Sequence, residues 1–245
     1  MFSAAIKILK RQIRLQQRSF RDRRRGITPL LARQKNTTPP PGFEQHIALQ
    51  QDIRAGYNFE NKCRNISLAA DKINGLQIAS GQWFSFWATV GTPNRRRGFL
   101  PSRNLVNGQI SEAIGGGICQ VSGALYHCAL LAGLEIRERH PHSMDIYEEH
   151  ERFSPLGADA TVVYGYKDLR FQNPFPFPIM LCLKTENMQL QAGISSPQAL
   201  APRSIQFLRE DSEKYRTVRT CLFLAPDAME ELTVSRYSPL KHKNT

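Results

Sequence analysis

The stretch Gly115-Gly-Gly-Ile-Cys-Gln-Val-Ser-Gly-Ala-Leu-Tyr-His-Cys-Ala-Leu-Leu-Ala-Gly133 decides the fold, because it predicts a glycine turn that leads into a buried helix. Glycine adopts backbone dihedrals that other residues avoid, so three glycines in a row favour a tight turn. The apolar residues that follow recur at helical spacing, and Gly133 suits the end of a helix. Few polar residues interrupt this run, so we expect the helix to be buried on most sides.

Cys119 is predicted to lie in the first turn of this helix. The unpaired N–H groups and the positive dipole end of a helix favour the anionic form of a thiol there. A glycine loop that leads a cysteine onto a helix start therefore suits a nucleophile. The competing interpretation is a core helix that contains a buried cysteine, since free cysteine is among the most buried residue types.

Charge is unevenly distributed along the 245 residues. Residues 1–35 hold eleven of the 33 Lys and Arg residues and one of the 21 acidic ones, so ten of the twelve net positive charges lie there. The five cysteines form no C-x-x-C pair, which argues against a disulfide framework or zinc knuckle and favours a reduced, cytoplasmic setting. We find no apolar run of membrane-spanning length and no secretory signal.

The N-terminal segment, residues 1–42, is predicted to be a basic amphipathic helix followed by a Pro-rich linker. Its apolar residues fall close to one helical face: Phe2, Ile6, Leu9, Ile13 and Phe20. Such a helix lies on an anionic membrane surface or docks on an acidic partner, and it can also be a solvated tail. Nonspecific binding to nucleic acid requires only a basic tail, but we do not expect nucleic acid as a partner.

The rest of the chain predicts an α+β domain with a mostly antiparallel sheet. Further helices are expected at 44–55 and 64–73. Strands are expected at 76–79, 83–87, 104–106, 109–111, 134–139, 161–166, 169–172, 178–184, 188–194, 204–209, 215–224 and 231–236. Asn107-Gly108 is a strong hairpin signal. We divide the chain into the basic segment 1–42, a domain over 43–195 and a C-terminal extension over 196–245.

Two histidines can reach Cys119. His140 and His142 follow the strand expected at 134–139, and a helix of about 22 Å is matched in length by a strand of seven or eight residues that runs back along it. A cysteine nucleophile needs a base, and the base needs an orienting acceptor. Candidate acceptors are Asp145, Asp159 and Asp168. Zinc bound by the cysteine and both histidines is a further interpretation, but the spacing is no familiar zinc pattern, so we expect neither a metal nor a cofactor.

Six ordered motifs give the chain a family resemblance. They are Gly81-Gln-Trp-Phe-Ser-Phe86, Val90-Gly91 with Asn107-Gly108, Gly115-Gly-Gly-Ile-Cys-Gln120, Glu138-Arg-His-Pro-His-Ser143, Thr161-Val-Val-Tyr164 and Asp168-Leu-Arg-Phe-Gln-Asn173. In this order they resemble the VanW family, in its short form without a signal peptide. The resemblance covers residues of about 60–185.

The resemblance implies a chemistry. VanW domains of some larger exported proteins are associated with L,D-transpeptidase activity, which forms peptidoglycan cross-links through a cysteine acyl-enzyme. Carried over, Cys119 is the nucleophile, His142 or else His140 is the base, and Asp168 is the orienting acid because it lies in a matched motif. The remaining site residues are oxyanion donors at the helix start, Gly116, Gly117 and Gln120, and Arg139 for a substrate carboxylate. The order of nucleophile, base and acid along the chain also resembles that of papain and transglutaminase cores, which is an analogy of fold only.

We therefore expect a cysteine-dependent acyl transfer or amide hydrolysis on a cell-wall-type peptide, with peptidoglycan or its precursor as the substrate that the resemblance implies. The alternative is a non-catalytic binding or scaffold domain, associated with glycopeptide resistance or with the membrane surface. Because we see no export signal, we expect a cytoplasmic protein, with the basic segment able to hold it at the inner face of the membrane.

Overall fold

The computed structural model describes residues 2–36, 38–56, 58–106, 109–145, 147, 149–225 and 228–239. The helices are α1 (Phe2–Arg24), α2 (Phe59–Ile73), α3 (Phe86–Val90) and α4 (Cys119–Ala132), with short 3-10 turns at Thr28–Leu30, Arg95–Arg97 and Glu149–Glu151. The strands are β1 (Glu44–Asp52), β2 (Gln77–Ile78), β3 (Trp83–Ser85), β4 (Pro101–Val106), β5 (Gln109–Ile114), β6 (Glu135–Glu138), β7 (Met144–Asp145), β8 (Arg170–Gln172), β9 (Ile179–Glu186), β10 (Gln189–Ser196), β11 (Ser204–Asp211), β12 (Arg216–Ala225) and β13 (Ala228–Pro239).

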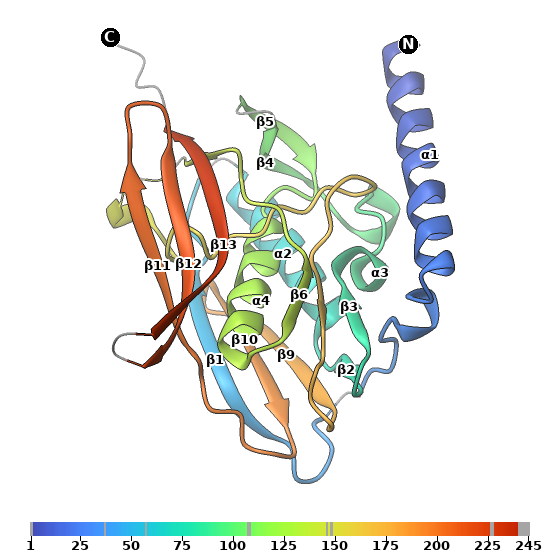
Figure 1. Cartoon of the computed structure of the whole chain (residues 1–245). Coiled ribbons are helices and arrows are strands. Elements are labelled where there is room, and N and C mark those ends of the chain that lie inside the picture. Colours follow the sequence, from blue (N-terminus) through green and yellow to red (C-terminus); the bar gives the residue numbers. More distant parts are fainter. Residues whose placement is uncertain are drawn as a thin grey trace.

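The main sheet carries the two longer helices of the domain. Its strand order is β1-β10-β9-β2, and every neighbouring pair is antiparallel. Helix α2 packs against β9, and α4 packs against β10 and β1, so both helices cover one face of this sheet (Figure 1). The α+β class and the mostly antiparallel pairing expected from the sequence are confirmed.

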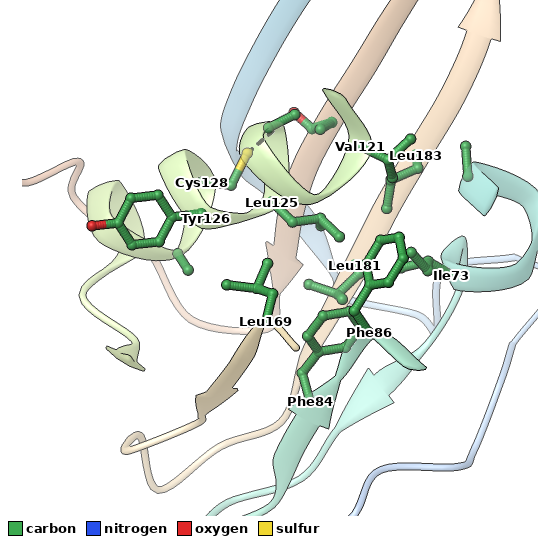
Figure 2. Packing of buried hydrophobic residues seen from close by; sticks show 14 of the residues in the cluster. Ile73, Phe84, Phe86, Val121, Leu125, Tyr126, Cys128, Leu169, Leu181 and Leu183 are labelled. Atoms are coloured by element: carbon green, nitrogen blue, oxygen red, sulfur yellow. Dashed lines mark hydrogen bonds between the residues drawn. The ribbon is translucent and has the colours of Figure 1, made fainter. Parts of the chain in front are cut away.

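Helix α4 is buried on most sides, as its composition predicts. Val121 and Leu125 are almost fully buried and lie in one cluster with Leu181 and Leu183 of β9 (Figure 2). Further along the helix, the buried Cys128 thiol donates a hydrogen bond to the carbonyl of Ala192, 3.5 Å away. Burial of this much apolar surface on both α4 and the sheet fixes the height and rotation of the helix, and with them the place of its first residue, Cys119.

Three smaller sheets surround this layer. Strands β11, β12 and β13 form an antiparallel sheet that β7 extends by a parallel pairing, while β3, β8 and β6 form another (Figure 1). Strands β4 and β5 pair as the predicted hairpin, whose turn, Asn107-Gly108, lies outside the described residues. The three strands expected after residue 203 are present: β11 and β13 are longer than expected, and β12 has the expected length but is shifted by one residue.

The segment 44–55, expected as a helix, is the strand β1. It pairs with β10 from Glu44 to Asp52. Its buried residues Ile47, Gln51 and Ile53 are separated by even numbers of residues, which satisfies a period of two, while the four-residue spacing of the first pair also suits a helix. Pairing with the sheet decided between the two patterns.

Two further segments differ from the prediction. The run 161–166, expected as a strand, is irregular, because Val163 and Lys167 close a tight loop with two reciprocal backbone hydrogen bonds of 2.9 Å. The strand expected at 83–87 ends at Ser85. There the Ser85 hydroxyl accepts a hydrogen bond from the Ala88 N–H and caps helix α3. The helix expected at 64–73 is present as α2 but begins earlier, at Phe59.

Helix α1 stands along one side of the domain (Figure 1). It is tied there by ion pairs between Arg18 and Glu138 and between Asp22 and Arg170. Within the described residues, no helix has both the length and the apolar character needed to cross a bilayer.

Candidate functional site

A glycine turn places Cys119 at the N-terminus of α4, as the sequence predicts. Gly115 and Gly117 have φ of +83° and +95°, and a Cβ on Gly117 would lie only 2.7 Å from Cγ of Lys62. The fully buried Asn65 holds this turn, because its side-chain amide donates to the carbonyls of Leu100 and Gly116 at 2.9 and 3.0 Å. Glycine is therefore required here both for its dihedrals and for space.

Cys119 is half-buried and meets His142. Its thiol lies 3.8 Å from the carbonyl oxygen of Val162 and next to the imidazole of His142, whose pKa it helps to raise. The cysteine is thus neither sealed in the core nor fully exposed. The structure brings together the two residues that the sequence placed first for nucleophile and base.

The acid beside His142 is Asp159. Its Oδ2 lies 2.7 Å from Nδ1 of His142 and accepts a second hydrogen bond, also of 2.7 Å, from the His142 backbone N–H. The two segments run side by side, since the Thr161 N–H donates to the carbonyl of His140 at 2.7 Å. Cys119, His142 and Asp159 therefore form a chain of polar contacts that resembles a nucleophile–base–acid triad.

The electrostatics of this trio favour a charged ring. Burial lowers the pKa of His142. Its interactions with Asp159 and Cys119, and the negative charges of these two groups, raise the pKa by more than burial lowers it, to about 10. Burial raises the pKa of Asp159, yet the His142 hydrogen bond and the nearby cations hold it well below its ordinary value. A protonated imidazole beside a thiol is an arrangement that cysteine nucleophiles use.

Asp168, the acid expected from the family motif, lies apart from His142 and has other partners. Its carboxylate accepts hydrogen bonds from the Ser85 hydroxyl at 2.6 Å, the Trp87 backbone N–H at 3.1 Å and Nε of Arg170 at 2.9 Å. The side chain is 2% exposed. These contacts join β3, α3 and β8, so the structure places Asp168 apart from His142, and Asp159 lies in the position beside His142 that was expected for Asp168.

His140 is likewise turned to another cluster. Its Nε2 lies 3.1 Å from Oε1 of Glu138, which also binds Arg18 of α1 and the backbone N–H of Asp168. Burial raises the pKa of Glu138. The hydrogen bonds from His140 and Arg18 lower this pKa by more than burial raises it, to about 2. His142 is therefore the histidine that the fold directs to the cysteine.

Arg139 was expected to receive a substrate carboxylate, but the structure engages it internally. Its guanidinium is 5% exposed, lies 2.8 Å from Oδ1 of Asp159, and donates to the carbonyl of Gly157 at 2.9 Å. It also lies over the ring of Tyr126, 4.9 Å from the centroid. Arg139 thus holds the acid of the trio in place and has no face left for a ligand.

Tyr237 is a residue of the site that no sequence motif indicated. Its hydroxyl donates to Oδ1 of Asp159 at 2.5 Å, and burial raises its pKa, so it remains a donor. Ser235, two residues earlier on β13, binds Arg139. Both come from the segment treated as a C-terminal extension, about 80 residues beyond Asp159. Ser235 and Tyr237 are two residues apart on a strand, so the sequence could have placed them on one face of it. No residue pattern in that strand indicated that this face contacts the site.

The expected oxyanion donors are mostly occupied. The side-chain amide of Gln120 donates to the carbonyl of Asp52 at 2.9 Å, its backbone N–H donates to Gly117, and the Gly116 N–H donates to Ala113. Oε1 of Gln120 is buried with no partner within the described chain. Among the described residues, none accepts a hydrogen bond from the backbone N–H of Cys119.

The trio lines a pocket of about 180 Å³. One wall is apolar and is built by Met144, Phe153, Pro155 and Leu156. Arg54, which is exposed, and Lys62 stand on the β1–α2 side. No three His, Cys, Asp or Glu side chains in the described parts of the chain are arranged to hold a metal ion. The pocket thus places an apolar wall and two cationic side chains near the Cys119 thiol.

Known proteins resemble this chain over the part that contains the trio. Residues 61–195 match the family model described as VanW like protein. The chain is 38% identical over 143 residues to the uncharacterized protein YoaR of Bacillus subtilis (strain 168), covering 57% of this chain and 46% of YoaR. It is 32% identical over 190 residues to the vancomycin B-type resistance protein VanW of Enterococcus faecalis (strain ATCC 700802 / V583), covering 74% of this chain and 69% of that protein. No solved structure matches the chain, so the likeness to papain or transglutaminase cores stays a prediction.

Proposed function

The chain belongs to the VanW family, and we propose that it is a cysteine-dependent enzyme that transfers or hydrolyses an acyl group of a peptide. The observation that supports this most is the position of His142, between the Cys119 thiol and the Asp159 carboxylate on the wall of a pocket. A core cysteine needs no such partners. Nucleophilic catalysis needs all of them.

In the proposed reaction, the Cys119 thiolate attacks the acyl carbonyl carbon, and a C–S bond forms as the carbonyl electrons move onto oxygen. The Cys119 backbone N–H and the N-terminus of α4 stabilise that oxyanion. When the intermediate collapses, the C–N bond breaks and His142 gives its Nε2 proton to the leaving amine. Asp159, bound to Nδ1, keeps the ring oriented and balances its charge.

The resulting thioester is then attacked by water or by an acceptor amine. His142 takes the proton of the attacking group, and the thiolate leaves. Water gives hydrolysis, and an amine gives a new amide bond, so the same residues serve either outcome. The name of the Enterococcus relative refers to vancomycin resistance, which favours a cell-wall-type peptide as the substrate class for this chain.

Substrate binding is assigned to the two sides of the pocket. The apolar wall suits a hydrophobic part of the peptide, and Arg54 supplies a cation for a carboxylate in place of Arg139. We expect Arg54→Gln to weaken peptide binding and to leave the alkylation rate of Cys119 unchanged. A loss of both would indicate that Arg54 acts through the fold instead.

Alkylation provides the first test. Burial raises the pKa of the other four thiols, which belong to Cys63, Cys128, Cys182 and Cys221. With iodoacetamide at pH 7 and peptide mapping by mass spectrometry, we expect Cys119 to react faster by on the order of tenfold or more. Five similar rates in the folded protein would overturn the proposal.

Trapping of the acyl-enzyme provides the second test. Incubation with peptidoglycan stem peptides is expected to add the mass of an acyl fragment to Cys119, and Cys119→Ala is expected to abolish the adduct. Cys63→Ala is the matched control, since that half-buried thiol lies on α2. If stem peptides bind Cys119→Ala and the wild type equally and no adduct forms, the domain is a non-catalytic binding module.

A further inference from the structure

Helix α1 contacts the domain through one side of the helix. Arg11, Leu15, Arg18 and Asp22 are the residues of its central and last turns that are shielded from solvent, and they recur at spacings of four, three and four. Arg18 binds both carboxylate oxygens of Glu138 at 2.6 and 2.9 Å. Such spacing puts all four residues on one side of the helix, facing the domain.

Asp22 and two arginines complete this attachment. The Asp22 carboxylate binds the buried Arg170 guanidinium through two hydrogen bonds of 2.9 and 2.8 Å. Arg14 lies over the ring of Tyr166, 4.3 Å from its centroid, and Arg11 lies near Tyr164. The attachment thus combines Leu15 with charged and aromatic groups, while the other large apolar side chains described in α1 are exposed.

The apolar stripe points the other way. Ile6, Leu9, Ile13 and Phe20 are 49%, 61%, 44% and 63% exposed. At 100° per residue they occupy a sector of roughly 60° on the side opposite Arg18. The side chain of Phe2, expected on the same stripe, lies outside the described residues. A surface helix of a globular protein normally turns its apolar face inward, so this helix is inverted.

Cations flank the stripe. Lys10, Arg21 and Arg24 are exposed, and at 100° per residue they fall on the stripe or within about 80° of its nearest members. The single acidic residue of α1, Asp22, is consumed by Arg170. The outward side of α1 therefore combines apolar and positively charged groups without a carboxylate.

We infer that α1 is a docking surface for an anionic lipid bilayer, on which it lies parallel to the membrane plane. Apolar side chains can enter the acyl boundary while the flanking cations meet lipid phosphates. A second copy of this chain fits poorly, because it would set two strongly basic helices against each other. Nucleic acid would meet the cations and leave the apolar stripe in water. This inference is independent of the chemistry proposed for Cys119.

The test is vesicle co-sedimentation of the full chain. With vesicles of 30% phosphatidylglycerol in phosphatidylcholine we expect binding that is at least about tenfold stronger than with pure phosphatidylcholine. The double variant Leu9→Gln/Ile13→Gln is expected to lose at least about tenfold in partitioning. Its matched control is Leu224→Gln, a residue 66% exposed on β12, which should bind like the wild type.

Further measurements test the role of the cations and the two other possible partners of this surface, a second copy of the chain and nucleic acid. Lys10→Gln/Arg21→Gln should weaken binding to the anionic vesicles and leave the circular dichroism spectrum and melting temperature unchanged. Equal binding by the Leu9/Ile13 variant and the wild type would overturn the inference. So would a dimer in sedimentation equilibrium that the same variant dissociates, or tighter binding to duplex DNA than to anionic vesicles.

Discussion

At the scale of single residues, Cys119, His142 and Asp159 lie together on the wall of one pocket, and Asp168 lies outside this group. Cys119 and His142 lie in motifs whose local pattern, glycine turn and strand end, fixes their places. Asp159 and Asp168 are both acids on the return segment, and spacing cannot separate them. What separates them is tertiary: the chain from 157 to 161 runs beside 140–142, while Asp168 is held by Ser85 and Arg170.

A matched pair of substitutions distinguishes the two acids. Asp159→Asn should abolish the excess alkylation rate of Cys119 at pH 7, because His142 loses the charge that favours its protonated form. Asp168→Asn should lower the melting temperature and leave that rate unchanged. The measurement is the pH profile of iodoacetamide labelling at Cys119. The reverse result would return Asp168 to the site.

The charge of His142 makes stability depend on pH. Its folded-state pKa, about 10, lies above the ordinary value near 6.5, so its contribution is complete below about pH 6.5 and is lost as the pH rises toward 10. We expect the free energy of unfolding of the wild type to fall toward that of His142→Gln across this window, in urea titrations. A constant gap between the two proteins would contradict a charged, paired ring. His140→Gln is the control and should parallel the wild type.

Tyr237 offers a test of the support around Asp159. Tyr237→Phe removes the donor to Oδ1 and leaves a buried carboxylate oxygen with Arg139 alone. We expect a loss of about 2 kcal/mol in the free energy of unfolding, measured with urea, since hydrogen bonds to charged groups contribute about 1.5–3 kcal/mol. An unchanged stability would mean that water replaces the hydroxyl at no cost.

At the scale of elements, strong local signals predicted well and ambiguous ones did not. The glycine turn, helix α4 and the strands β9 and β10 lie where the sequence predicted them. The spacing of the buried residues in segment 44–52 fits both a helix and a strand, and only the pairing with β10 makes the segment a strand. The segment 161–166 is rich in β-branched and aromatic residues, but Gly165, at φ +82° against Arg11 of α1, lies in a loop.

The turn before α4 can be tested by Gly117→Ala. The new methyl group would meet Lys62 at 2.7 Å on a residue with φ of +95°, so we expect a loss of about 1–3 kcal/mol in unfolding free energy and slower labelling of Cys119. Gly56→Ala is the control, because a Cβ there meets nothing within 4 Å. Equal stability of the two variants would show that the turn tolerates a side chain.

At the scale of the whole molecule, segments from both ends of the chain join the domain in the middle. The composition of residues 1–35 predicted a basic amphipathic helix, but not that Asp22 would reach a buried arginine 148 residues away. The strands after residue 203 were predicted, but not that β13 would contact the trio. Long-range pairs of this kind leave no periodic trace in one sequence.

Asp22→Ala measures the attachment of α1. It leaves the Arg170 guanidinium, 8% exposed, with Asp168 and without its two bonds to α1, so we expect a loss of about 3 kcal/mol in unfolding free energy. Arg23→Ala, on an exposed neighbouring position, should change stability little. The two variants can be compared by calorimetry. Equal melting temperatures would mean that α1 is held mainly by Arg18.

The segment from Asp159 to Tyr166 touches three parts of the molecule in turn. It begins at His142, passes its Val162 carbonyl beneath the Cys119 thiol, and ends with two tyrosines under Arg11 and Arg14. A protease that cleaved the chain after Arg25 would uncover those rings and would remove the α1 partners of Glu138 and Arg170. N-terminal cleavage would therefore change the surroundings of the Cys119 thiol. A shortened form of this protein would then differ from the intact one in the reactivity of Cys119 as well as in membrane attachment.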